Sequence, residues 1–129
     1  MVSDISMPCS YSIDKERKLL TCTGWGRLTA AEAAKLQKEF TDDPDFRRDL
    51  HQIVDLMAVT DLIADSAELR ELAIKAPFQE GSRRAILVKN KVEYGIARMT
   101  QAYREISGGR DEIRIFEDRD QALQWLLSA

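Results

Sequence analysis

Short apolar runs alternate along this chain with stretches in which apolar residues recur every three or four positions. The runs are typical of β-strands, and the three-to-four spacing is typical of amphipathic helices. The predicted strands are residues 9–14, 18–25, 51–56, 84–88 and 112–116. The predicted helices are residues 30–40, residues 65–76, the stretch from Val92 to the Gly108-Gly109 pair, and a last segment capped by Asp118. A chain that alternates in this way is expected to fold as an α/β domain.

The order of the predicted elements is two strands, a helix, and then three further strand–helix pairs. Strands separated by helices pair in parallel through right-handed crossovers. The short polar turn at residues 14–17 instead makes the first two strands an antiparallel hairpin. The sequence therefore predicts a mixed, mostly parallel sheet of about five strands with four covering helices.

Local signals predict where several elements begin and end. Residues 29–32 (Thr-Ala-Ala-Glu) match a capping box at the start of the first helix. Gly24 and Gly26 predict the end of the second strand, and residues 57–64 are predicted as a loop. The clearest amphipathic stripe belongs to the third helix and is predicted to face the core; it comprises Val92, Ile96, Met99, Tyr103 and Ile106.

Bulk properties narrow the class of protein. The length of 129 residues is ordinary for one domain, so we expect a single domain over residues 1–129. A net charge of -3 gives no basic footprint, and nucleic acid is not an expected partner. We expect neither a signal peptide in residues 1–8 nor a membrane span, which makes the cytoplasm the expected compartment. No glycine-rich phosphate loop or metal-ligand spacing is present in the sequence, so we expect no cofactor and no metal.

Several stretches, taken in their joint order and spacing, resemble a known group of proteins. They are 26–29 (GRLT), 53–56 (IVDL), 84–88 (RAILV), 95–99 (GIARM), 115–118 (IFED) and 122–126 (ALQWL). The chain resembles the SpoIIAA-like proteins with a STAS-type fold, which are related in architecture to bacterial anti-sigma-factor antagonists and have been compared with the CRAL-TRIO lipid-binding domain. The resemblance implies a fold of successive β-α units with an extra N-terminal strand.

The resemblance also implies a place for a regulatory phosphate. In the antagonists, a serine at the start of the helix after the central strand is phosphorylated within a pattern close to Asp-Ser-Ser-Gly-Leu. Here residues 65–69 read Asp-Ser-Ala-Glu-Leu, so the usual acceptor matches Ala67 and the glycine matches Glu68. That departure weakens the case for a phosphate switch. A phosphate on Ser66 is favoured by the helix N-terminus and opposed by Asp65 and Glu68.

Two candidate sites follow from the predicted architecture. The first is a rim at the carboxyl ends of the parallel strands, where α/β proteins bind ligands. Its candidate members are Asp55, Thr60, Asp65, Ser66 and Arg98. The second is an apolar pocket between the sheet and the second and third helices, lined by Trp25, Leu62, Ile63, Met99 and Tyr103.

Each candidate has an ordinary structural alternative. Asp55 also suits the cap of a local turn. Arg83, Arg84 and Arg98 either meet an anionic ligand or form exposed ion pairs, which is the commoner outcome.

The nucleophilic and titratable residues do not group as an active site. His51 is the only histidine and is expected to be a solvated side chain at a strand entry rather than a catalytic base. Cys9 and Cys22 lie on adjacent predicted strands and would face each other across a two-residue turn, which allows a disulfide. Two buried thiols in a reducing compartment are the favoured alternative.

Three functions are compatible with these features. The first is a non-catalytic regulatory or interaction domain that offers the rim to a protein partner. The second is a binder of a small apolar or lipid-like ligand, and the third is an enzyme. An enzyme is disfavoured, because no nucleophile, base and orienting group fall together. A homodimer through an exposed apolar patch is compatible with each.

Overall fold

The computed structural model describes residues 8–128, which form five strands and four helices in the predicted order. The strands are β1 (Cys9–Asp14), β2 (Leu19–Thr29), β3 (His51–Ile63), β4 (Arg83–Leu87) and β5 (Glu112–Phe116). The helices are α1 (Ala30–Thr41), α2 (Ser66–Ile74), α3 (Lys91–Ile106) and α4 (Arg119–Leu127). The predicted α/β class is therefore confirmed.

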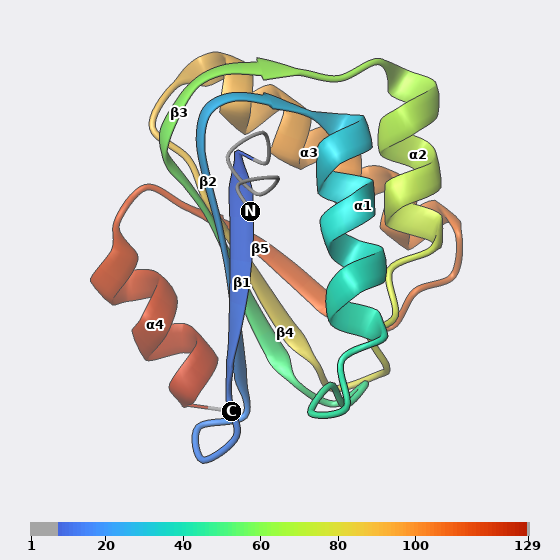
Figure 1. The fold of residues 1–129 in the computed structure, drawn as a ribbon, viewed down its shortest axis with the longest axis vertical. Helices are drawn as coiled ribbons and strands as arrows, with labels where there is room; N and C mark the ends of the chain where they lie inside the picture. The colour runs from blue at the N-terminus through green and yellow to red at the C-terminus, as the bar shows by residue number, and fades with distance from the viewer. Residues whose placement is uncertain (1–7, 129) are drawn as a thin grey trace, which may run out of the picture.

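The strands form one mixed sheet in the order β1-β2-β3-β4-β5, so each strand lies beside its neighbour in sequence. β1 and β2 pair antiparallel, and the three remaining pairs are parallel. Successive crossovers thus move in one direction across the sheet, and crossovers of one hand then leave their helices on the same face. Figure 1 shows this arrangement, with α1, α2 and α3 on one face and α4 on the other.

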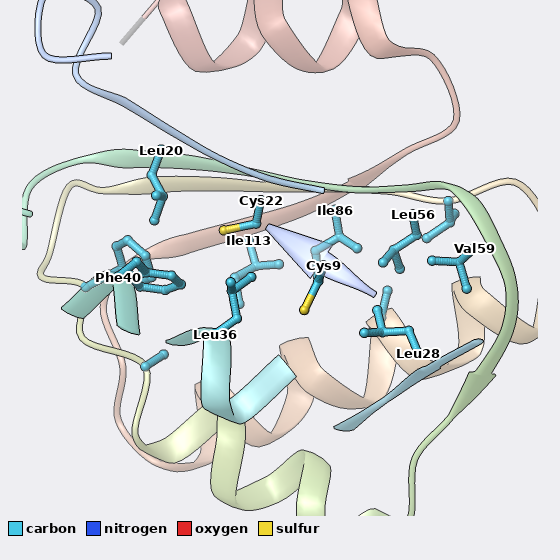
Figure 2. Packing of buried hydrophobic residues seen from close by; sticks show 14 of the residues in the cluster. Cys9, Leu20, Cys22, Leu28, Leu36, Phe40, Leu56, Val59, Ile86 and Ile113 are labelled. Atoms are coloured by element: carbon cyan, nitrogen blue, oxygen red, sulfur yellow. The ribbon is translucent and has the colours of Figure 1, made fainter. Parts of the chain in front are cut away.

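The hydrophobic core has two parts because both faces of the sheet are covered. The larger part lies between the sheet and α1–α3, and Figure 2 shows Cys22, Leu56 and Ile86 pointing from their strands toward Leu36 of α1. The smaller part packs under α4 and comprises Leu19, Ile53, Ala85, Ala122 and Leu126. Neighbouring residues of one strand therefore serve different layers, as the period of two in a strand requires.

β2 and β3 are longer than predicted. Gly24 and Gly26 do not end β2, which continues to Thr29, and the predicted loop 57–64 continues β3 as far as Ile63. The pairing absorbs two register shifts around these glycines, and Gly26 adopts a left-handed φ of 62°. The glycines therefore mark bulges in a continuous strand rather than its end. The extended ends of β2 and β3 curve over the helix layer toward α1 and α2 (Figure 1).

The orientation of α3 differs from the prediction. Val92 and Ile106 of the predicted inner stripe are 66% and 82% exposed, and Met99 is also exposed. The buried residues of the helix are Glu93, Ala97 and Arg104. The apolar pattern predicts the wrong buried face because two charged residues, Glu93 and Arg104, point into the core. Each has a partner of opposite charge there, Lys89 and Asp111 respectively.

The partner of Glu93 is Lys89, at the carboxyl end of β4. Lys89 Nζ lies 2.8 Å from Glu93 Oε2 and also donates hydrogen bonds to the carbonyl oxygens of Leu56 (3.2 Å) and Val59. The same lysine thus neutralises the buried carboxylate and satisfies two carbonyls where β3 bends. This contact fixes the N-terminal end of α3 against the sheet.

The two cysteines do not face each other. Four residues, 15–18, connect β1 and β2, so Cys22 lies opposite Tyr11 and Cys9 lies opposite Gly24. Both thiols are buried and free. A two-residue turn would have placed the two cysteines opposite each other, and that turn is absent. The structure instead agrees with the alternative of two buried thiols.

Between residues 8 and 128, no helix combines the length and the apolar composition needed to cross a bilayer.

Candidate functional site

A cavity of about 140 Å³, partly open to solvent, lies beside the larger core, between the sheet and the three helices α1, α2 and α3. Most of its wall is apolar. The large apolar side chains that line it are Leu28, Leu36, Phe40, Val54, Leu56, Leu62, Leu69, Leu72, Ile86 and Ile96.

Small residues at facing positions create the space. Ala33 of α1, Ala73 of α2 and Ala97 of α3 all line the cavity. Each helix therefore presents an alanine to the space where a larger residue would close it. Side chains that border this space lack packing partners on one side, so a ligand of matching shape would add van der Waals contacts there.

A connected series of polar side chains runs along the sheet beside the cavity. Gln52 Nε2 donates to Cys22 Sγ (3.3 Å), and Arg84 Nε donates to Gln52 Oε1 (3.0 Å). Arg84 Nη1 then donates to Asp111 Oδ2 (2.9 Å), and Arg104 Nε donates to Asp111 Oδ1 (2.7 Å). We call these five residues the polar series. Three of them, Cys22, Gln52 and Arg84, line the cavity, so its wall has one polar side.

The register of the sheet brings the polar series together. Gln52 of β3 is paired with Arg84 of β4, and each points to the face covered by α1–α3. Arg84 is only 7% exposed, and its guanidinium lies 4.6 Å from the centre of the Phe78 ring. Burial lowers the pKa of Arg84 from its ordinary value, while the nearby carboxylate of Asp111 acts in the opposite direction. The guanidinium is thus held charged in a poorly solvated place.

Arg104 ties the far end of the polar series to the helices. Its Nη2 donates to the carbonyl of Phe78 (2.9 Å), and its Nη1 donates to that of Ala73 (3.2 Å). A positive charge is favourable at the C-terminal end of a helix, where carbonyls lack partners, and α2 ends here. Arg104 therefore links α3 to the end of α2, to the segment that follows it, and to Asp111, the residue before β5.

Burial also raises the pKa of the two thiols in the cavity wall, Cys9 and Cys22. It raises the pKa of Cys9 to about 11, with Glu32 and Glu39 adding to the effect. It raises the pKa of Cys22 to about 12, against the opposing influence of Gln52 and Arg84. Both cysteines are therefore protonated at neutral pH, which suits a wall residue and does not suit a nucleophile.

The five rim residues of the sequence analysis do not converge. Asp55 accepts a hydrogen bond from the Met57 backbone and pairs with Arg119 at 2.6 Å. Arg98 is exposed and donates to Gln101 within its own helix. Thr60 is exposed on β3. Within residues 8–128, no hydrogen bond or ion pair joins any two of the five.

Asp65 and Ser66 occupy the start of α2. The Asp65 side chain accepts from Glu68 N (2.8 Å), and the Glu68 side chain reaches back to the Asp65 backbone, which completes a capping box. Ser66 is the exposed first residue of the helix. Two carboxylates therefore flank the serine that a phosphate would modify.

Of the five predicted pocket residues, Leu62 lines the cavity. Trp25 and Met99 are exposed, and Ile63 and Tyr103 lie outside the cavity wall. α3 presents Ile96, Ala97 and Thr100 to the cavity, so the wall includes Ile96 of the predicted stripe but neither Met99 nor Tyr103. Sequence reasoning did not find Gln52 in the wall; the available signal was a polar residue in register with apolar strand positions.

The fold defined by this sheet and these helices is SpoIIAA-like. The crystal structure of an uncharacterised protein of the DUF3478 family from Shewanella loihica, described as having a SpoIIAA-like fold, is similar with a TM-score of 0.59. The two chains are 18% identical, and the match covers 92% of this chain and 93% of that one. No family model and no curated protein matches the sequence. The resemblance noted from the sequence is thereby confirmed for the fold.

Proposed function

We propose that this protein binds a small apolar ligand in the cavity between its sheet and α1–α3. The observation that supports the proposal is the cavity itself, about 140 Å³ in volume, apolar over most of its wall and bounded by three separate helices. A cavity of about 150 Å³ in another protein holds benzene, so the ligand that fits without rearrangement has a body of about that size.

Binding of such a ligand stabilises the fold in two ways. It restores the van der Waals contacts that the empty wall lacks, and it removes the ligand's apolar surface from water. A ligand that binds only the folded state raises the free energy of unfolding in proportion to the logarithm of its concentration above Kd. Thermal unfolding is therefore a direct assay for this function.

The test compares benzene and toluene binding by two variants of adjacent alanines on α1. Ala33 lines the cavity and Ala34 is exposed. We expect toluene to raise the Tm of the wild-type protein and of Ala34→Leu, and to leave the Tm of Ala33→Leu unchanged. Calorimetric titration checks the stoichiometry, which is expected to be one. Absence of a Tm rise in the wild type, or an equal rise in Ala33→Leu, contradicts the proposal.

A regulatory interaction resembling that of the anti-sigma-factor antagonists is the second candidate. The exposure of Ser66 at the start of α2 supports it, as does the exposed apolar stripe of Val92, Met99 and Ile106 on α3. Co-purification from cells that produce Ser66→Ala or Ser66→Glu tests it. We expect a protein bound to the first variant to be absent from the second. Identical partners in the two preparations contradict a phosphate switch.

A further inference from the structure

Arg84 is the charged residue in the wall of the cavity, and not all of its N–H groups are used in hydrogen bonds. Its guanidinium carries five N–H groups, of which Nε donates to Gln52 and Nη1 donates once to Asp111. Nη2 makes no hydrogen bond to any of residues 8–128. Every fully buried side-chain nitrogen or oxygen of those residues has a partner, so Nη2 is not sealed within the protein. Arg84 lines the cavity, so the cavity is a space in which a ligand would meet this guanidinium.

The charges around Arg84 do not balance. Two arginines, Arg84 and Arg104, share the single carboxylate of Asp111, whose side chain is fully buried. Among residues 8–128 the other buried carboxylate is that of Glu93, and it is paired with Lys89. The polar series therefore carries one excess positive charge in a place with little water. An unbalanced buried charge is unfavourable by several kcal/mol, and a bound anion relieves that penalty.

We propose that the ligand of the cavity is a small apolar carboxylic acid whose carboxylate binds the guanidinium of Arg84. This inference rests on the proposed function and adds the chemical class of the ligand. A planar guanidinium matches a carboxylate in geometry, and one negative charge cancels the excess of one positive charge. A dianionic phosphate would reverse the imbalance instead of removing it. The apolar body then fills the space toward Ala33, Ala73 and Ala97.

The test compares benzoate with benzyl alcohol, a neutral molecule of similar size, by calorimetric titration at neutral pH. We expect the wild-type protein to bind benzoate at least about tenfold more tightly, because a hydrogen bond to a charged group is stronger than a neutral one. Arg84→Met is expected to bind both compounds with similar affinity. That variant leaves Asp111 balanced by Arg104 alone, so the fold is expected to survive.

Arg83→Met is the matched control. Arg83 is the neighbouring residue of β4, but its side chain donates to the carbonyl of Trp125 on the α4 side of the sheet. We expect this variant to keep the preference for benzoate. The inference is overturned if benzyl alcohol binds the wild type as tightly as benzoate, or if Arg84→Met keeps the preference. In that case, binding of the neutral compound that is lost in Ala33→Leu still supports the proposed function. Failure of both compounds to bind the wild type overturns both.

Discussion

The side chain of Arg104 fills the space in which a Cβ on Gly109 would lie. Arg104 is held there by Asp111 and by the carbonyls of Ala73 and Phe78, and a shift of its guanidinium would break these bonds. The Gly109→Ala variant is expected to displace the guanidinium and to lose about 3 kcal/mol of stability, because it breaks a buried ion pair. Urea unfolding measures the loss.

Gly95→Ala is the control for this substitution. Gly95 lies within α3, and a Cβ there meets nothing within 4 Å. Alanine is the better helix former, so we expect this variant to gain about 0.5–1 kcal/mol. A loss below about 1 kcal/mol in Gly109→Ala would show that Arg104 does not need its observed position.

His51 is expected to make stability depend on pH in the mildly acidic range. Burial lowers its pKa from the ordinary 6.5, with Lys18 and Arg83 adding to the effect and Asp49 opposing it. The unfolded chain therefore binds a proton at a higher pH than the folded protein does. The full contribution of neutral His51 is present above pH 6.5, and it is lost as the pH falls from 6.5 through the folded pKa.

The check is the unfolding free energy between pH 7 and pH 5, measured for the wild type and for His51→Asn. His51 Nδ1 accepts a hydrogen bond from Arg83 N (2.9 Å), and asparagine offers an acceptor in a similar position without titrating. We expect the slope to disappear in the variant. The carboxyl groups with a lowered pKa act below this range; they are Asp14, Asp43, Asp49 and Glu71. If the pH dependence of the unfolding free energy is the same in His51→Asn as in the wild type, a group other than His51 causes it.

Cys9 and Cys22 are expected to react slowly with alkylating reagents in the native protein. The thiolate is the reactive form, and raising the pKa of Cys9 to about 11 and of Cys22 to about 12 leaves little of it at pH 8. We expect native labelling to be at least about a hundredfold slower than labelling in denaturant. Mass spectrometry after timed quenching measures both rates, and native labelling as fast as that in denaturant would contradict the burial of the thiols.

Filling the cavity is expected to stabilise the protein without a ligand. Leucine at Ala33 occupies part of the empty space, so Ala33→Leu is expected to gain about 1 kcal/mol. The exposed Ala34→Leu is expected to change stability by less than about 0.5 kcal/mol. Thermal unfolding separates the two. A destabilised Ala33→Leu combined with an unchanged Ala34→Leu would mean that the space is already too small for the added carbons.

Features that depend on neighbours within four residues could be predicted from the sequence. The capping box from Thr29 to Glu32 and the N-cap at Asp118 need only local hydrogen bonds, and both are present. The continuation of β2 past Gly24 could not be predicted in the same way. It depends on pairing with β3, which lies some 30 residues further along the chain. A glycine by itself indicates either a turn or a bulge, and only the partner strand decides between them.

The cavity and the polar series depend on contacts that are still more distant. Arg84 meets Asp111 across 27 residues, and that pairing lets charged residues occupy positions that the periodicity assigns to apolar ones. The alanines that leave the cavity open are indistinguishable in sequence from ordinary helix-forming alanines. Leu62 lines the cavity, whereas the more conspicuous Trp25 is exposed, because hydrophobicity predicts burial but does not locate an empty volume.

The orientation of α3 leads to a prediction that separates the structure from the sequence pattern. The pattern places Ile106 in the core, whereas the structure leaves it 82% exposed and buries Ile86 at 8%. Ile106→Ala is therefore expected to change stability by less than about 0.5 kcal/mol, and Ile86→Ala is expected to lose about 2–5 kcal/mol. Chemical denaturation of both variants, at a protein concentration low enough to exclude self-association, gives the comparison. A loss of more than about 2 kcal/mol in Ile106→Ala would indicate that Ile106 is buried. In that case α3 would have the orientation that its periodicity predicts, and Glu93 and Arg104 would lie outside the core.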